Sequence, residues 1–243
     1  MALERGHNLK RLLKEAEPGR PLTTSRLAQM GVSAQLAHHY VENKWLDKLG
    51  HGVFLRAGDQ PSLEKSLAVA APKAHVGGKT ALSWHGYKHN LYLREPVLLY
   101  SEARDRLPDW LTSRFPVELR HRRLFRTDES FAVGAQPEFS GTLLSEPERA
   151  VLEMLSEVPS RQSLTEAESI LEMLHGLRPD IMQPLLENCV NVKAKRLFLN
   201  LAKQSGLPVL EDLNLEKIDL GADADYVLPI PGGSVRIPKP REA

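Results

Sequence analysis

Two short motifs contain residue types that do chemistry in enzymes. The triplet Gly78-Lys79-Thr80 resembles the end of a phosphate-binding loop, but that loop needs a glycine where this chain has Lys73. His85 and His89 stand four residues apart, as two metal ligands on a helix do, yet Gly86 weakens the helix and no catalytic glutamate accompanies the pair. The motifs therefore predict no catalytic residue, no cofactor and no metal site, and we do not expect an enzyme.

Residues 33–45 show a third pattern, in which polar hydrogen-bonding side chains share one face of a helix. Apolar residues recur at three- and four-residue spacing, which turns Leu36, Ala37, Tyr40 and Val41 inward. The outward face then carries Ser33, Gln35, His38, His39 and Glu42. A helix from Ser33 to Trp45 would be about 20 Å long, which suits a DNA major groove about 12 Å wide. We predict that Ser33, Gln35, His38 and His39 contact base edges or phosphates.

The residues before this helix predict a shorter one. Thr23 and Thr24 can cap its first turn, and Gly31 can end it by taking the left-handed conformation that other residues avoid. Ser33 then caps the next helix. An amphipathic helix over residues 3–16 precedes both.

A hairpin is predicted after these helices. Trp45 and Leu46 would close the second helix against the core, and residues 48–54 indicate two short strands joined by a glycine-containing turn. Helix, turn, helix and hairpin is the order of a winged helix-turn-helix, so we predict such a DNA-binding domain over residues 1–58. Thr24, Arg26, Lys48 and His51 would anchor the phosphate backbone.

The rest of the chain predicts a C-terminal domain over residues 61–243, after a turn-forming linker at 58–61. Its α/β part spans about 61–144, and its mainly helical part spans about 145–243. The helical part would start at a Ser145 cap, contain about four helices and end in a hairpin turning at residues 232–233. The predicted fold class is α+β: an N-terminal winged helix-turn-helix followed by a mixed α/β and helical C-terminal domain.

Two further groups of basic residues are candidate surfaces. Arg120 and Arg122 would project from one face of a strand, either as a partner- or phosphate-contacting ridge or as a solvated face. A second basic patch, for nucleic acid or another partner, would be formed on a late helix by Lys193, Lys195, Arg196 and Lys203, all expected to project to solvent.

Composition limits the alternatives. The 243 residues are 42% hydrophobic and 26% charged, which is ordinary for a globular protein. Residues 1–140 hold 21 Lys and Arg against 15 Asp and Glu, whereas 141–243 hold 11 against 16, so the first part is basic. No run is long enough for a membrane helix or has the pattern of a signal peptide, so we expect a cytoplasmic protein without a membrane partner. The single cysteine, Cys189, is expected to be a buried thiol.

Four phrases occur in order along the chain: VSAQLAHHYVENKWLDKLGHGVFLRAGD, AHVGGKTALSWHGYKHNLYL, LSEPERAVLEML and VKAKRLFLNLAKQSG. Together they resemble the AbiEi-type antitoxins of type IV toxin-antitoxin systems. The resemblance implies an intracellular regulator whose winged helix binds inverted repeats of double-stranded DNA in its own promoter, and whose C-terminal domain is needed for antitoxin action. It also implies a nucleotidyltransferase-like toxin that is opposed without a stable complex.

The predicted function is therefore that of a DNA-binding transcriptional autorepressor and antitoxin, present as a monomer or as a dimer assembled on DNA. One alternative is a winged-helix module that docks a protein and has no specific DNA binding. Another is a stand-alone regulator without a toxin, since the hairpin near residues 223–238 is more acidic than the family pattern suggests. A nucleotide-binding enzyme built on residues 77–80 ranks last.

Overall fold

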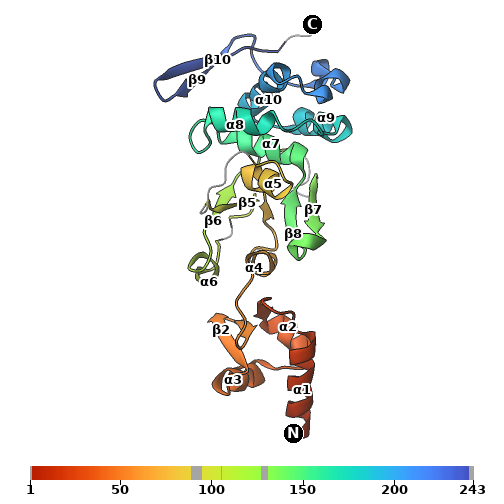
Figure 1. The fold of residues 1–243 in the computed structure, drawn as a ribbon, viewed down its shortest axis with the longest axis vertical. Coiled ribbons are helices and arrows are strands. Elements are labelled where there is room, and N and C mark those ends of the chain that lie inside the picture. Colours follow the sequence, from red (N-terminus) through yellow and green to blue (C-terminus); the bar gives the residue numbers. More distant parts are fainter. Residues whose placement is uncertain (1, 89–94, 105, 127–130, 241–243) are drawn as a thin grey trace. The chain divides into compact units, whose positions relative to one another are not determined.

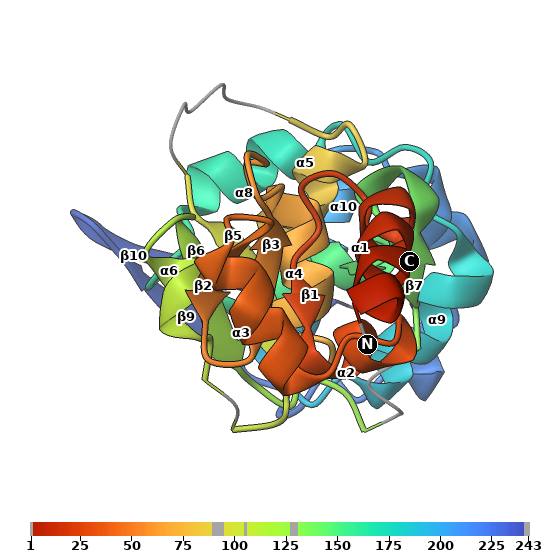
Figure 2. The same cartoon turned by 90° about the horizontal axis from the view of Figure 1, so that it is seen from below.

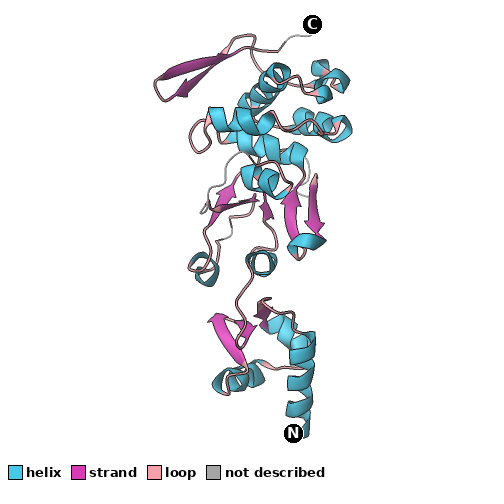
Figure 3. Cartoon of the chain, in the orientation of Figure 1, coloured by secondary structure: helices cyan, strands magenta, loops and turns pink. Residues whose placement is uncertain are grey.

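The computed structural model describes residues 2–88, 95–104, 106–126 and 131–240, with only the backbone considered for residues 2–6. The chain contains both helices and β-sheets (Figures 1 and 3), which confirms the predicted α+β class. The chain divides into two compact units. The first comprises residues 1–73 together with the later segments 106–117 and 135–142, and the second comprises the remainder.

The first unit begins with three helices and a small sheet. In chain order these are α1 (Ala2–Glu15), β1 (Leu22–Thr23), α2 (Thr24–Gln29), α3 (Ala34–Glu42), β2 (Leu46–Gly50) and β3 (Val53–Arg56). The strands are antiparallel in the order β1-β3-β2. Helix α3 lies beside both α2 and β2 (Figure 2). The core of this part contains Leu12, Leu27, Met30, Ala37, Tyr40, Leu46 and Phe54, so each element contributes an apolar face.

Local sequence signals explain the helix starts. Thr23 is the N-cap of α2, and its hydroxyl accepts a hydrogen bond from the Arg26 N–H. Ser33 does the same for α3 through the Leu36 N–H. Gly31 lies between the two helices with φ +78°, the left-handed conformation that the sequence predicted.

The predicted end of the second helix was wrong. Helix α3 ends at Glu42, because Asn43 donates a side-chain hydrogen bond to the His39 carbonyl and Lys44 turns into the left-handed region with φ +56°. Trp45 therefore lies outside the helix and is 45% exposed, whereas Leu46 is buried as predicted.

Three further short helices belong to the first unit. These are α4 (Leu63–Ala70), α6 (Asp109–Thr112) and the 3-10 turn η1 (Pro137–Phe139). Ser62 caps α4, and the Thr142 hydroxyl donates to the Glu64 carbonyl. Helix α6 packs against the hairpin strand β2, although it lies far from it in the sequence.

The second unit contains most of a five-stranded sheet, in the order β6-β5-β4-β8-β7. The strands are β4 (His75–Val76), β5 (Val97–Ser101), β6 (Val117–His121), β7 (Val133–Gln136) and β8 (Thr142–Ser145). Its helices are α5 (Gly78–Trp84), α7 (Pro147–Ser156), α8 (Leu164–Leu171), α9 (Pro179–Asn188) and α10 (Val192–Gln204). The 3-10 turns η2 (Pro208–Asp212) and η3 (Leu215–Lys217) follow, and then the hairpin of β9 (Tyr226–Ile230) and β10 (Gly233–Ile237).

Helix α7 is central to this unit, since every residue from Glu148 to Ser156 is buried and α7 packs on α5, α8, α9 and α10. The prediction of about four helices in this part is confirmed by α7, α8, α9 and α10, and the predicted late hairpin is confirmed by β9 and β10. Ser145 is not the N-cap of α7, however. Glu146 occupies that position, and the Ser145 hydroxyl donates instead to Glu153 Oε2 at 2.9 Å.

Glu153 is the buried polar centre of the second unit. Its carboxylate accepts hydrogen bonds from His75 Nε2 (2.8 Å), the Gly78 N–H (3.0 Å), the Ser145 hydroxyl and Arg149 Nε (2.9 Å). Burial alone would raise the pKa of Glu153, but its contacts with His75 and Arg149 outweigh burial and hold this pKa at about 2. The carboxylate thus joins β4, β8, α5 and α7.

Candidate nucleic-acid interface

The outer face of α3 has the composition that the sequence predicted. Ala37 and Tyr40 are buried, and Leu36 and Val41 are partly buried against the same core. The solvent-exposed residues are Ser33 at the N-cap, Ala34, Gln35, His38, His39 and Glu42. The helix therefore offers hydroxyl, amide and imidazole groups to solvent from a backbone that the core holds in place.

The contacts of these side chains leave most of their hydrogen-bonding capacity available. Ser33 uses its oxygen as an acceptor for the helix cap, so its O–H remains a donor. Gln35 makes no hydrogen bond with any described residue. His38 lies edge-on to Phe54, with ring centroids 6.3 Å apart. His39 is the most engaged, since Asn43 Nδ2 lies 3.3 Å from its ring nitrogens and Glu42 lies 3.9 Å away.

The hairpin carries the second group of predicted residues. Lys48 on β2 and His51 in the turn are exposed. The Thr24 N–H donates to the Gly52 carbonyl at 3.0 Å, which ties the start of α2 to the hairpin turn. Arg26 donates to Gln29 Oε1 at 3.1 Å. Among the described residues, no carboxylate forms an ion pair with Arg26 or Lys48, so both charges are available to an anion.

One residue that supports the hairpin could not be inferred from the sequence. Trp110 on α6 is buried against Gly50, and a Cβ atom at position 50 would lie 2.7 Å from its Cδ1 atom. The β2–β3 register shifts between Lys48 and Gly50, so this contact lies next to a bulge. The only sequence signal is the pair of glycines at 50 and 52, which predicts a turn but does not identify its partner.

The second basic patch is a wrong prediction for most of its members. Lys195 and Arg196 are 1% and 3% exposed. The Arg196 guanidinium donates to three backbone carbonyls, those of Leu220, Ala222 and Ala224. The Lys193 ammonium is half-buried and donates to the carbonyls of Ser156, at the end of α7, and Val158. Burial lowers the pKa values of Lys193 and Lys195 from their usual range. Only Lys203 of the four is exposed.

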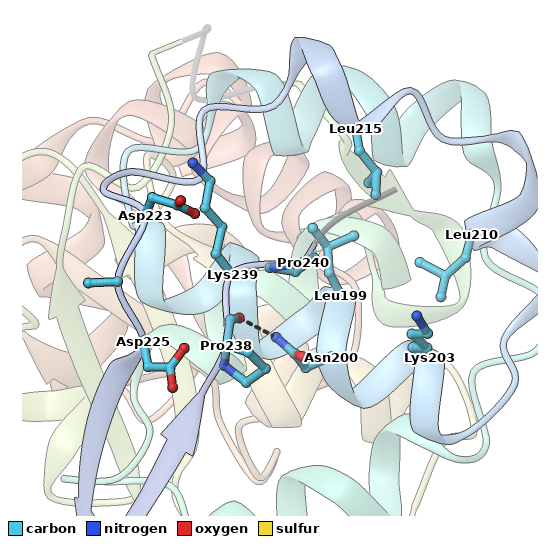
Figure 4. Close-up of a pocket in the computed structure, with 11 residues that line it drawn as sticks. Leu199, Asn200, Lys203, Leu210, Leu215, Asp223, Asp225, Pro238, Lys239 and Pro240 are labelled. Atoms are coloured by element: carbon cyan, nitrogen blue, oxygen red, sulfur yellow. Dashed lines mark hydrogen bonds between the residues drawn. The ribbon is translucent and has the colours of Figure 1, made fainter. Parts of the chain in front are cut away.

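Lys203 lines a cavity of about 630 Å³ in the second unit (Figure 4). The cavity lies between α10, the 3-10 turns and the segment after β10. Asn200 closes one side by donating to the Pro238 carbonyl at 3.0 Å. Two lysines, Lys203 and Lys239, face two aspartates, Asp223 and Asp225, so the lining charge is balanced.

The remaining motifs have structural contacts. His85 Nε2 donates a hydrogen bond to the Ser145 carbonyl (2.9 Å), while His89 lies outside the described residues. Cys189 is buried as predicted, and burial raises the pKa of its thiol to about 11. Lys79 pairs with Glu95 and Glu166.

Within the described ranges, no three His, Cys, Asp or Glu side chains are grouped as a metal ion would require. No helix of the described chain is both long and apolar enough to span a bilayer.

Comparison with known proteins assigns the family. Residues 5–93 match the family model described as "Transcriptional regulator, AbiEi antitoxin N-terminal domain". Residues 94–236 match "Transcriptional regulator, AbiEi antitoxin, Type IV TA system". No curated protein gives a significant sequence match. Among solved structures, the fold is similar to that of the RV2827C protein from Mycobacterium tuberculosis, with TM-score 0.58, 15% identity, and coverage of 90% of this chain and 86% of that chain. The resemblance seen in the sequence is thereby confirmed, and the chain belongs to the AbiEi antitoxin family of transcriptional regulators from type IV toxin-antitoxin systems.

Proposed function

We propose that the N-terminal part of this chain is a winged helix-turn-helix in which α3 enters the DNA major groove. One observation carries the proposal: opposite Ala37 and Tyr40, α3 exposes the polar side chains of Gln35, His38, His39 and Glu42. The buried side fixes the helix, so the polar side is presented to a ligand without reorganisation. The hairpin β2–β3 is the wing, and residues 1–58 form the proposed DNA-binding domain.

In this arrangement Ser33, Gln35, His38 and His39 meet base edges or phosphates, and Thr24, Arg26, Lys48 and His51 anchor the phosphate backbone. The formal positive charge of this set is limited to Arg26 and Lys48, and Glu42 opposes it. Binding should therefore depend on hydrogen bonding at α3 more than on charge, with few phosphates neutralised.

The biological role that we propose is autorepression combined with antitoxin action by residues 61–243. Two copies would bind inverted repeats in the promoter of the system. Their half-site centres would lie about 34 Å apart, or a multiple of that distance, because each reading helix must meet the same face of the duplex. Each copy is a monomer in free solution in this proposal, and the dimer assembles on DNA.

Fluorescence anisotropy tests the DNA proposal, with the full chain titrated against its own upstream region and against a scrambled duplex at several salt concentrations. We expect preferential binding to the upstream region, weakening by roughly 0.9 in log affinity per neutralised phosphate and per decade of salt. Equal weak binding to both duplexes would reject specific DNA recognition and favour a protein-docking role for the winged helix.

The antitoxin role needs a separate experiment. We propose that the chain opposes a nucleotidyltransferase-like toxin without binding it stably. Co-expression with the neighbouring toxin gene should restore growth, while size-exclusion chromatography of the mixed purified proteins should show two separate peaks. Growth arrest that persists despite equal expression would reject the antitoxin role, and a co-eluting complex would reject the mechanism without a stable complex.

A further inference from the structure

Unpaired polar atoms are concentrated around one cavity of the second unit. Five buried side-chain nitrogen or oxygen atoms of the described residues lack a hydrogen-bond partner, and four of them belong to Tyr100, Arg120 and Glu157. All three residues line the same cavity of about 340 Å³, a volume at the lower end of small-molecule sites. Buried polar groups in proteins are normally paired. Two of the four atoms, Tyr100 Oη and Arg120 Nε, can donate to an anion, whereas the two Glu157 oxygens are acceptors that face the arginines.

The charges at this cavity do not balance locally. The Glu157 carboxylate is 3.4 Å from Arg120 Nε, 3.3 Å from Arg122 Nε and 3.7 Å from Arg161 Nη1, without an aligned hydrogen bond in any of these contacts. Arg120 also contacts Glu118 at 2.7 Å. Three guanidinium groups thus face two carboxylates, which leaves one positive charge in excess. In the strand around Arg120, the Arg120 side chain is turned toward Glu157 and is 11% exposed, whereas the Arg122 side chain is 39% exposed, so Arg120 does not form the solvated face that the sequence left open.

The other charged group of the lining is already neutralised. Lys79 lies 2.8 Å from Glu95 and 3.5 Å from Glu166, and Gln162 donates to the second oxygen of Glu166 at 2.9 Å. Lys79 thus brings two carboxylates for one ammonium, so the four cations and four carboxylates balance as a whole, and the excess of positive charge is confined to the arginine side of the cavity. The Arg161 side chain is 56% exposed and can turn toward a ligand without leaving a packed site.

Tyr100 contributes a donor. Its side chain is 3% exposed, and burial, together with the nearby charges of Glu153 and Glu157, raises the pKa of Tyr100 above its usual range. The hydroxyl keeps its proton and can donate it to an anion. Gly78 lies against this hydroxyl, and a Cβ atom there would be only 2.8 Å from Tyr100 Oη, so the glycine leaves the space that the hydroxyl occupies.

We propose that this cavity binds a small organic anion whose phosphate or carboxylate group is held by Arg120, Arg161 and Tyr100. Guanidinium forks match both oxyanions in a bidentate geometry, and removal of water strengthens the contact. Glu157 is a positioning residue, since it holds the arginines together. Pro96, Leu98 and Met154 supply an apolar wall for the rest of the ligand.

Thermal shift and isothermal titration calorimetry of the full chain test the site. The probes are inorganic phosphate, adenosine monophosphate and citrate, each compared with sodium chloride at equal ionic strength. We expect saturable binding of at least one probe and a higher Tm in its presence. Binding by phosphate and the nucleotide would identify phosphate as the group, and binding by citrate alone would identify carboxylate.

Two variants and a control make the result specific. Tyr100→Phe removes a hydroxyl that has no partner among the described residues, so the variant should fold with an unchanged or higher Tm and bind about tenfold or more weakly. Arg161→Gln should weaken binding similarly. Arg123→Gln changes an exposed arginine outside the cavity lining and should bind as the wild type does.

The proposal fails if none of the three probes binds more tightly than chloride. It also fails if Y100F and R161Q bind as tightly as the wild type and R123Q. These measurements contain no DNA, so their outcome is independent of the function proposed above.

Discussion

Trp110 packs against Gly50 so closely that a Cβ atom at position 50 would lie 2.7 Å from the indole Cδ1 and 3.2 Å from Cγ. The two residues belong to the same compact unit, but they lie far apart in the chain. The contact holds strand β2 of the proposed wing at Gly50, two residues after Lys48. The first unit is therefore completed by a segment that follows the predicted domain of residues 1–58.

We expect Gly50→Ala to destabilise the protein by about 1–3 kcal/mol, because the added methyl must displace a packed indole. Chemical denaturation of the variant measures this effect. Gly233→Ala is the matched control, since a Cβ there meets nothing within 4 Å. In a Trp110→Ala background the cost of Gly50→Ala should largely disappear, and an unchanged cost would show that the indole is not its cause.

The sequence was most informative where structure depends on neighbouring residues. The inward and outward faces of α3 follow from the 3.6-residue period, and the caps at Thr23 and Ser33 follow from short polar side chains before a helix. The end of α3 was not predictable in the same way. It depends on a side-chain bond from Asn43 and on a left-handed Lys44, a conformation that the sequence does not favour.

Contacts between distant segments account for the other differences. The sequence predicted that Lys195 and Arg196 project to solvent. The carbonyls that bind Arg196 come from an irregular segment at residues 220–224, and the path of this segment cannot be inferred from periodicity. The contact between Trp110 and Gly50 also joins segments that are distant in the chain, so periodicity could not predict it. The buried Glu153 network also combines residues from β4, α5, β8 and α7, and the sequence showed none of these partnerships.

Glu153→Gln should lower the free energy of unfolding by about 3–5 kcal/mol at neutral pH, because it leaves the buried Arg149 without its carboxylate. Denaturant unfolding followed by circular dichroism measures this loss. Glu172→Gln is the control, since Glu172 is exposed and should change stability by no more than about 0.5 kcal/mol. Equal stability of the two variants would contradict the structural role of Glu153.

The same network predicts a pH dependence. The pKa of Glu153 in the folded protein is about 2, below its value of 4.5 in an unfolded chain. The unfolded state therefore takes up a proton first as the pH falls, so the stabilisation is complete above pH 4.5 and is lost between there and about pH 2. The stability difference between wild type and E153Q should shrink over this window, and a constant difference would contradict it.

Arg26→Gln and Lys48→Gln should each weaken DNA binding for all sequences alike, if these residues contact phosphates. Each substitution should also reduce the slope of log affinity against log salt by roughly 0.9. Anisotropy titrations at several salt concentrations measure both effects. Lys217→Gln alters an exposed lysine of the second unit and should leave the slope unchanged. If both variants keep the wild-type slope of log affinity against log salt, then Arg26 and Lys48 do not contact the phosphate backbone.

DNA binding should strengthen as the pH falls if the histidines of α3 contact phosphates, since a protonated imidazole adds a positive charge to the interface. Protonation adds charge where only Arg26 and Lys48 are otherwise positive, so the salt dependence should steepen together with the affinity. Anisotropy titrations at pH 8, 7 and 6 measure both. His38→Ala combined with His39→Ala should remove most of the pH effect, whereas His175→Ala, an exposed histidine of the second unit, should not. A pH dependence that survives in the double variant would show that His38 and His39 do not cause it, and would contradict phosphate contacts by these two histidines.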